Sequence, residues 1–459
     1  MRYDWPSKYC RTVGLRQVVR KCANLRRRCP SPVREARIDS RQEGRAMGGG
    51  RVKVLVVGAG PAGTATALLL ARFGVKVKLV EREASFERTF RGEGLMPLGI
   101  DALFEMGLGG VLETVPGRTV ESWDIWIDGE EVFVTPEPVE ELGERAMRVV
   151  SQPCLLEKML EEASRYPSFS FERGARVHDL LRDRDGRFVG AALKKGEGTE
   201  EARADLVVGC DGRGSLVRKR AGLGLKLLPE QYDVLWFKVP APERLQEGCS
   251  IMIAVAAKEH PALCYTSWDG RLQFGLVMPK GGLKELREKD WVSKAVRSVP
   301  SWLAEHIVSN QDEIEGPTRL NVLVGCAPRW TAPGVMLLGD ASHPLSPVRA
   351  QGINLALRDA VVAANHLVPV LRGGSEASAL DAACRAVQAE REPEIVRAQR
   401  LQRREAAGQG DARSASWRFE LTKRLARRMG RYRWAQATWL RRQHDLRFGS
   451  KEVKLKISA

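Results

Sequence analysis

The sequence lacks the short motifs that mark most metal-dependent, triphosphate-hydrolysing and serine-nucleophile enzymes. Its nine cysteines form no C-x-x-C pair, and its six histidines show no H-x-x-x-H or other metal-binding spacing, so no metal site is indicated. It has no G-K-[ST] phosphate-binding loop and no G-x-S-x-G elbow, so triphosphate and serine hydrolysis lose their usual support. Scattered cysteines are typical of free thiols in a reducing cytosol.

The body of the chain also lacks an excess of positive charge. The formal net charge is +17, but residues 1–50 hold 13 Lys/Arg against 4 Asp/Glu, and residues 400–459 hold 17 against 5. The residues between these ends hold 44 against 48, so no nucleic acid is expected as a partner of the body. A chain of 459 residues with 43% hydrophobic content predicts a globular protein of two domains.

The first 50 residues combine arginine runs with no apolar periodicity, and they end in Met47 and three glycines just before a strand pattern. We interpret residues 1–50 as a basic, disordered extension and expect translation to begin at Met47. An organelle transit peptide is the alternative, because acids are few, but serine is sparse too. Residues 1–46 are therefore predicted to be dispensable for folding.

A strand, turn, helix and strand pattern at residues 52–83 organises the chain. A β-branched run at 52–57 leads into G-A-G-P-A-G at 58–63, a helix pattern follows at 64–73, and a second strand at 75–80 ends at Glu81. In G-x-G-x-x-G the glycines permit a tight turn, close approach of a pyrophosphate and close helix packing, and the acid suits a ribose hydroxyl. The uncharged run 54–71 resembles a membrane span, but its glycines and proline argue against one. The stretch predicts a dinucleotide site.

Two later segments place an aspartate at the end of a buried strand. The first, G-C-D-G-R-G-S-L-V-R at 209–218, could be an Asp-Gly hairpin, but the basic, helix-like residues after it favour a strand end at a helix start. The second, G-D-A-S-H-P at 339–344, precedes a helix whose N-terminus could bind a ring carbonyl, while Asp340 could bind a ribityl or ribose hydroxyl. His343 alone is more typical of a structural histidine.

Antiparallel strands are predicted where strand patterns follow one another without helices. Residues 125–134 form a hairpin pattern around Asp128-Gly129, and residues 232–278 form several strands, with Asp269-Gly270 at a turn. Aromatic residues gather in the second segment. Most are expected to pack in a core, but a flat organic substrate could also be held there.

Three motifs stand in order along the chain: GAGPAG with Glu81, GCDGRGSLVR, and GDASHPLSPVRAQGIN. Together they resemble those of single-component FAD-dependent monooxygenases of the para-hydroxybenzoate hydroxylase type, over residues 51–372. The resemblance implies that NADPH or NADH reduces FAD, that a flavin hydroperoxide forms with dioxygen, and that oxygen is transferred to an aromatic or lipophilic organic substrate. The family has no separate nicotinamide domain, which agrees with the single G-x-G-x-x-G.

The resemblance also implies a set of FAD contacts. The glycine turn would serve the pyrophosphate, Glu81 the adenosine ribose and Asp340 the ribityl chain. Asp211 would serve FAD and the nicotinamide cofactor, and the helix start at 352–354 would face the flavin pyrimidine edge. Arg91 and Gln152 fall where members have flavin-contacting side chains, although Arg91 could equally be a solvated surface arginine. The predicted cofactor-binding set is Gly58, Ala59, Gly60, Pro61, Ala62, Gly63, Glu81, Arg82, Arg91, Gln152, Asp211, Gly339, Asp340, Pro347, Gly352, Ile353 and Asn354.

The predicted fold class is α/β, or α+β overall: a Rossmann-like FAD-binding domain with an inserted, mostly antiparallel β substrate domain and a C-terminal helical segment. The FAD-binding domain would comprise residues 51–120, 145–225 and 326–372. The substrate domain would comprise 121–144 and 226–325, and 373–459 would form a basic helical region.

Other functions are compatible with this fold. Reduction of isoprenoid double bonds is one and halogenation is another, but a halogenase of this type is expected to carry W-x-W-x-I-P, which W-D-I-W-I at 123–127 does not match. An alternative from another class is a flavin-containing, membrane-associated binding module. Substrate-stimulated oxidation of NAD(P)H with consumption of dioxygen would distinguish a monooxygenase from that module.

One catalytic candidate can be named. Arg349 lies between Pro347 and Gly352, where many members of the family carry glycine. Its guanidinium could border the flavin and favour an anionic substrate or the anionic reduced flavin. Alternatively, it points to solvent or pairs with an acid elsewhere, because arginine is rarely buried unpaired.

The C-terminal region carries apolar residues at near-helical spacing within a run of arginines: Trp417, Leu421, Leu425, Met429, Tyr432 and Trp439. This pattern is typical of a basic amphipathic helix. The helix could dock on the body of the protein or make peripheral contact with an anionic membrane.

Overall fold

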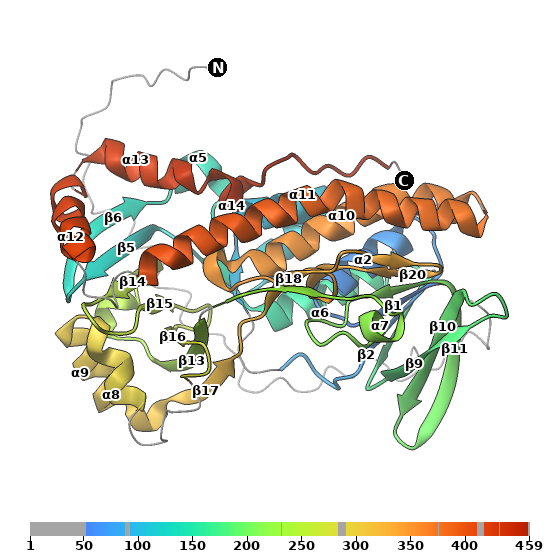
Figure 1. The fold of residues 1–459 in the computed structure, drawn as a ribbon, viewed down its shortest axis with the longest axis horizontal. Helices are drawn as coiled ribbons and strands as arrows, with labels where there is room; N and C mark the ends of the chain where they lie inside the picture. The colour runs from blue at the N-terminus through green and yellow to red at the C-terminus, as the bar shows by residue number, and fades with distance from the viewer. Residues whose placement is uncertain are drawn as a thin grey trace. The chain divides into compact units, whose positions relative to one another are not determined.

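The computed structural model describes residues 52–87, 92–230, 232–282, 291–374, 376–410, 417–430 and 432–457. The predictions on the extension at 1–50 and on Arg91 fall outside these ranges. Figure 1 shows two large sheets with helices packed against them and a C-terminal helical region. The predicted mixed α/β fold class is confirmed.

The larger sheet has eight strands and a parallel centre. Its order is β19-β20-β11-β1-β2-β8, and β10 and β9 extend it antiparallel from β11. β1 pairs in parallel with both β2 and β11, and β11 pairs in parallel with β20. The apolar residues of β1 and β2 run without strict alternation, as expected for a sheet covered on both faces. The strands are β1 (Val52–Val57), β2 (Val77–Glu81), β8 (Phe169–Arg173), β9 (Arg176–Arg182), β10 (Phe188–Lys195), β11 (Gly198–Gly209), β19 (Thr331–Ala332) and β20 (Val335–Leu337).

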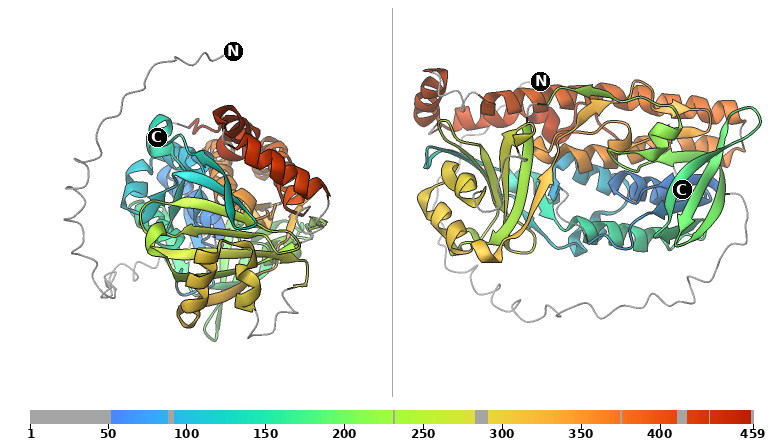
Figure 2. Two further views of the ribbon diagram at one scale, coloured as in Figure 1. Left: turned by 90° about the vertical axis from the view of Figure 1, so that its left-hand side faces the viewer. Right: turned by 60° about the horizontal axis from the view of Figure 1, so that its bottom comes forward.

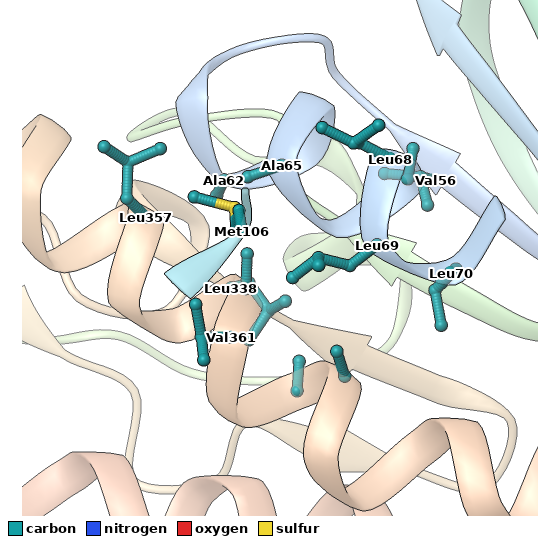
Figure 3. Close-up of a cluster of buried hydrophobic side chains, with 14 of the residues drawn as sticks. Val56, Ala62, Ala65, Leu68, Leu69, Leu70, Met106, Leu338, Leu357 and Val361 are labelled. Atoms are coloured by element: carbon teal, nitrogen blue, oxygen red, sulfur yellow. The ribbon is translucent and has the colours of Figure 1, made fainter. Parts of the chain in front are cut away.

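Helices α2 (Pro61–Arg72), α6 (Gln152–Ala163) and α10 (Gln351–Arg372) pack around this sheet. α2 begins at its proline, whose fixed φ suits the first helical turn, and its Ala- and Leu-rich residues are almost all buried. Figure 3 shows side chains of α2 meeting Leu357 and Val361 of α10 in one apolar cluster. The glycine turn before α2 therefore packs against the main cluster of buried apolar side chains.

Two smaller sheets and several short helices complete this part of the fold. A three-stranded sheet has the order β3-β7-β4, and a two-stranded sheet pairs β12 with β18. Their bounds are β3 (Gly94–Leu95), β4 (Gly117–Thr119), β7 (Arg148–Val150), β12 (Lys226–Leu228) and β18 (Val324–Cys326). The short helices are α3 (Pro97–Glu105), α4 (Gly109–Thr114), α5 (Val139–Leu142) and α7 (Leu216–Arg220).

The second large sheet has seven strands in the order β17-β13-β16-β15-β14-β5-β6. Its neighbours are antiparallel except β14 and β5, which pair in parallel. Helices α8 (Trp291–Ala295) and α9 (Ser301–Ser309) pack on it, and Figure 2 shows them in yellow beside its strands. The strands are β5 (Ser122–Ile127), β6 (Glu130–Pro136), β13 (Tyr232–Pro240), β14 (Ser250–Val255), β15 (Ala262–Thr266), β16 (Arg271–Pro279) and β17 (Glu315–Leu320). The division of the chain into two discontinuous domains stays a prediction.

The C-terminal region consists of α11 (Ala377–Gly410), α12 (Trp417–Met429), α13 (Arg433–Arg442) and α14 (His444–Phe448). α11 runs beside α10 in Figures 1 and 2. The single amphipathic helix predicted at 417–439 is instead two helices, because α12 ends just before Gly430, which packs against β6. In the part of the chain that the structure describes, no helix is long and apolar enough to cross a bilayer.

Candidate active site

The carboxyl ends of four parallel strands meet at one edge of the large sheet. Val57 at the end of β1 is paired with Val80 of β2 and Gly209 of β11, and Gly209 is paired with Leu337 of β20. The residues that follow these strand ends therefore gather at a common edge, which is where open α/β sheets bind ligands. Three separate sequence motifs are brought together here.

The glycine turn after β1 has the backbone conformation that its sequence predicts. Gly58 has φ +98°, and a Cβ on it would lie 2.6 Å from the Cys210 carbonyl oxygen, so only glycine fits. A Cβ on Gly63 would lie 1.8 Å from the Gly58 oxygen. A Cβ on Gly60 would meet nothing within 4 Å. The turn thus has two glycines required by packing and one whose backbone borders open space.

The carboxylate of Glu81 is buried at the end of β2 and supports the turn directly. It accepts hydrogen bonds from the backbone N–H of Ala59 at 2.8 Å and of Glu83 at 3.1 Å. Pro61 begins α2 and Ala62 is buried behind it. Arg82 is exposed and forms an ion pair with Glu83 at 3.0 Å.

Asp211 caps the short helix that follows β11. Its carboxylate accepts hydrogen bonds from the Ser215 hydroxyl at 2.5 Å and from the Leu216 and Val217 N–H groups at 2.6 and 3.1 Å. The buried guanidinium of Arg218 donates to the Ala341 carbonyl at 2.7 Å, which ties this segment to the loop after β20. The strand end before a helix, rather than a hairpin, is thereby confirmed.

A buried ionic network holds the loop that carries Gly339 and Asp340. Gly339 has φ +58° and donates its N–H to Asp359 at 3.1 Å. Asp359 also pairs with His343 Nε2 and with Arg391, both at 2.7 Å. Burial raises the pKa of Asp359, but the two partners outweigh it and leave that pKa below its usual value. His343 is thus a supporting histidine in the network.

The network continues to the end of the chain. Arg391 also pairs with Glu394, which pairs with Arg358 at 2.9 Å. Arg358 donates to the carbonyl oxygen of Lys451 at 2.5 Å, and the Ser450 N–H donates to Glu394 at 3.3 Å. α10, α11 and the C-terminal segment are therefore connected to the Gly339 loop by charges.

The start of α10 approaches the three-stranded sheet. Asn354 is buried, accepts the Met96 N–H at 2.9 Å, and donates to the carbonyls of Ala350 and Gly94 at 2.6 and 3.1 Å. A Cβ on Gly352 would meet nothing within 4 Å, so this helix start, like Gly60, borders open space. Of the other predicted residues, Pro347 and Gln152 are partly buried and Ile353 is buried.

The side chain of Arg349 is buried and has three partners. Its Nε pairs with Glu405 of α11 at 2.7 Å, and its guanidinium carbon lies 4.0 Å from the Trp123 ring centroid and 4.7 Å from that of Trp439. The alternative in which this arginine pairs with an acid elsewhere is therefore what the structure shows. Its Nη1 is buried without a hydrogen-bond partner. A contact with flavin stays a prediction.

Sequence reasoning missed a charged cluster where the loop before β3 meets the seven-stranded sheet. Glu93, just before β3, pairs with Lys238 of β13 at 3.0 Å and accepts a hydrogen bond from the Ser267 hydroxyl at 2.7 Å. Burial raises the pKa of Glu93, and the partners offset this only in part. Lys238 also pairs with Asp269 at 2.7 Å. Since these residues are far apart in sequence, only the acid within R-G-E-G could have drawn attention.

The arrangement fits an FAD molecule on several counts. A Cβ on Gly60 or on Gly352 would meet nothing within 4 Å, so both helix starts have room beside them for phosphate or ring oxygens. The acids after β2, β11 and β20 lie at the same sheet edge. No group of three or more His, Cys, Asp or Glu side chains within the described ranges could hold a metal ion.

Comparisons with known proteins agree with this geometry. The family described as "FAD binding domain" matches residues 51–398. The 6-methylpretetramide 4-monooxygenase of Streptomyces rimosus is 35% identical over 77% of this chain and 83% of its own, and squalene epoxidase 1 of Arabidopsis thaliana is 27% identical over 71% and 61%. The crystal structure of pqsL, a probable FAD-dependent monooxygenase from Pseudomonas aeruginosa, has a TM-score of 0.66 with 26% identity, over 80% of this chain and 98% of that one. The chain therefore belongs to the FAD-dependent monooxygenases, through the FAD-binding domain family that it matches.

Proposed function

We propose that this protein is an NAD(P)H-dependent monooxygenase that hydroxylates or epoxidises an aromatic or lipophilic organic substrate. The main support is the meeting of three motifs at one sheet edge, with the glycine turn, Asp211 and the Asp340 loop on adjacent parallel strands. Relatives named as a ubiquinone hydroxylase and as a squalene epoxidase support both reaction types. FAD, when bound, supplies the reduction of dioxygen that oxygen transfer requires.

Different residues at the carboxyl edge of the eight-stranded sheet would bind different parts of FAD. The open backbone at Gly60 would receive the pyrophosphate at the N-terminus of α2, where the helix dipole favours an anion. Asp340 would bind the ribityl hydroxyls. The backbone at 352–354 would face the flavin ring, and Asn354 would fix that helix start through its bonds to Met96 and Gly94 rather than by touching FAD.

Glu81 and Asp211 have internal partners, so their proposed roles have two parts. Glu81 orients the turn through the Ala59 N–H, and its second oxygen lies at the strand end where a ribose would sit. Asp211 fixes α7 and, through Arg218, the loop of Ala341. Both acids would thus shape the FAD site as well as contact it.

The clamp between Glu93, Lys238 and Ser267 joins the loop before β3 to the seven-stranded sheet. Gly94 comes directly after Glu93 and accepts a hydrogen bond from Asn354. A displacement of Glu93 would therefore also displace the start of α10, which we propose faces the flavin. We assign Glu93 a positioning role in setting how substrate sits over the ring.

The experiment measures NAD(P)H oxidation and dioxygen uptake by the FAD-loaded protein across a panel of aromatic and lipophilic compounds. A monooxygenase consumes both together and yields an oxygenated product. A double-bond reductase consumes NAD(P)H without dioxygen, and a binding module consumes neither, so either result would reject the proposal. Asp340→Ala should lose FAD and activity, whereas Asp312→Ala, at an exposed acid in the short turn before β17, is the matched control and should lose neither.

A further inference from the structure

α12 has two distinct faces, and its inner face is fixed to β5 and β6. Lys423 forms an ion pair with Asp128, Arg427 forms one with Glu130, and Ala426 packs against the small cluster that includes Val132. Just after the helix, a Cβ on Gly430 would lie 2.3 Å from the Val132 carbonyl oxygen. Docking of this helix on the body, one of the two predicted alternatives, is thus what the structure shows for this face.

α13 strengthens the attachment. The Trp439 ring meets Trp123 of β5 and Phe133 of β6 edge-on, with centroids 6.0 and 5.9 Å apart. Such pairs add stabilisation beyond the area they bury. The solvent-facing side of these two helices is therefore part of the folded surface of the protein.

The outer face of α12 consists of Leu421, Arg424, Leu425 and Arg428, which lie at positions i, i+3, i+4 and i+7 of one helix. Both leucines are 48% exposed. After the helix the surface continues with Tyr432 and Trp434, which are 52% and 57% exposed, with ring centroids 6.3 Å apart.

This surface differs from the scattered apolar residues found on any protein. Of the large apolar side chains exposed in the described ranges, only Leu227 and Val308 lie elsewhere. A hollow of about 390 Å³ opens between Arg424, Arg427, Arg428 and Tyr432. Apolar groups that gather in one place, with cations between them, mark an interaction site.

We propose that the outer face of α12, with Tyr432 and Trp434, docks on the interface of an anionic lipid bilayer. Charge complementarity selects this partner, because the leucines alternate with guanidinium groups that match lipid phosphates. Tyrosine and tryptophan are the side chains enriched at the depth of lipid headgroups. No insertion is required, since a rigid amphipathic surface binds in the plane of the interface.

The test is sedimentation of the FAD-loaded full-length protein with vesicles. Binding is expected to phosphatidylglycerol-containing vesicles at low salt, and it should weaken at high salt and on pure phosphatidylcholine. Failure to sediment with the anionic vesicles at low salt would overturn the proposal.

Two variants locate the contact. Arg424→Gln with Arg428→Gln should lower the vesicle partition coefficient roughly thirtyfold, because each cation near an anionic surface contributes a factor of roughly five and the two factors multiply. Leu421→Ser with Leu425→Ser should also release the protein. Exposed controls away from this surface, Leu227→Ser and Arg385→Gln, should sediment like wild type. If both outer-face variants bound the anionic vesicles as strongly as the wild-type protein, the assignment of the contact to this face would be overturned.

A second copy of the chain is the main competing occupant. The oligomeric state without lipid is therefore measured over a range of concentrations. Self-association that Leu421→Ser with Leu425→Ser abolishes would assign the face to a dimer and refute the lipid proposal. FAD absorbance reports whether each variant is folded, and because the vesicle assay needs no turnover, its outcome is independent of the proposed oxygenation.

Discussion

Substitution by alanine at two glycines of the first turn should have different effects. Gly60→Ala should weaken FAD binding, and Gly63→Ala should lower the free energy of unfolding. Gly60→Ala places a methyl group where nothing lies within 4 Å, on a backbone with φ −72° and ψ −177° that alanine adopts freely. Gly63→Ala places one 1.8 Å from the Gly58 oxygen. The first change fills the space assigned to the pyrophosphate, and the second forces the turn itself to move.

The magnitudes follow from these contacts. For Gly60→Ala, a weaker N-cap and a less flexible unfolded chain each shift the free energy of unfolding by under about 1 kcal/mol, with opposite sign. Loss of a charge-assisted contact with the pyrophosphate costs about 1.5–3 kcal/mol, or roughly ten- to hundredfold in the Kd of FAD. For Gly63→Ala, overpacking costs about 1–3 kcal/mol of unfolding free energy whether or not FAD is present.

Urea unfolding of the apoprotein measures the free energy of unfolding. Quenching of FAD fluorescence on titration with apoprotein measures the Kd of FAD. Gly110→Ala is the matched control, because Gly110 is exposed and a Cβ there also meets nothing within 4 Å. Wild-type FAD affinity in Gly60→Ala would show that the pyrophosphate does not rest on this turn. An apoprotein as stable as wild type in Gly63→Ala would contradict the packing argument.

Three further outcomes are expected. Because Arg349 just precedes the helix start that we propose faces the flavin, loss of its pairing with Glu405 in Arg349→Ala should retain FAD yet change flavin reduction or substrate-dependent oxidation about tenfold or more, measured by stopped flow. Wild-type rates would limit Arg349 to packing against Trp123. Because partners lower the pKa of Asp359 in the folded state, its stabilisation is present above the unfolded pKa of about 4 and is lost as pH falls through the lower folded value. The free energy of unfolding should therefore fall on acidification, and an equal slope in Asp359→Asn would rule out this carboxylate as a source. A protein beginning at Met47 should fold and bind FAD like the full chain, and an insoluble or flavin-free product would show that the preceding residues are needed.

The first turn could be predicted because its chemistry is local. Strand, glycines, helix and acid lie within 52–83, and each follows from a backbone rule that acts over a few residues. Asp211 and Asp340 were likewise found as strand ends. Their convergence required only that parallel strands end at the same edge of a sheet.

Contacts between distant segments could not be predicted. Nothing near Arg349 in the sequence indicates Glu405 or the two tryptophan rings that enclose it. The pairing of Glu93 with Lys238 joins segments from different sheets. Such pairs depend on how sheets pack, which periodicity within a segment does not encode.

The helix boundary at Gly430 shows the same limit on a smaller scale. Apolar spacing alone predicted one continuous helix over 417–439. The close approach of this glycine to Val132 is a tertiary contact, and the chain turns there to lay Trp439 on β5 and β6. Tertiary packing overrode a local pattern, as it commonly does for weak helix signals.

The pairing order of the large sheet also bears on how the protein is made. β1 leaves the ribosome early, but its neighbour β11 and the next strand, β20, come much later. The contacts that hold the Gly339 loop form later still. Asp359, which accepts the Gly339 N–H, pairs with Arg391, and the adjoining Arg358 donates to the carbonyl oxygen of Lys451. Long-range pairings form slowly and leave strand edges unpaired meanwhile. The FAD site is therefore incomplete until these later segments have been synthesised, and we expect FAD to bind only after the segment through Lys451 has joined the network.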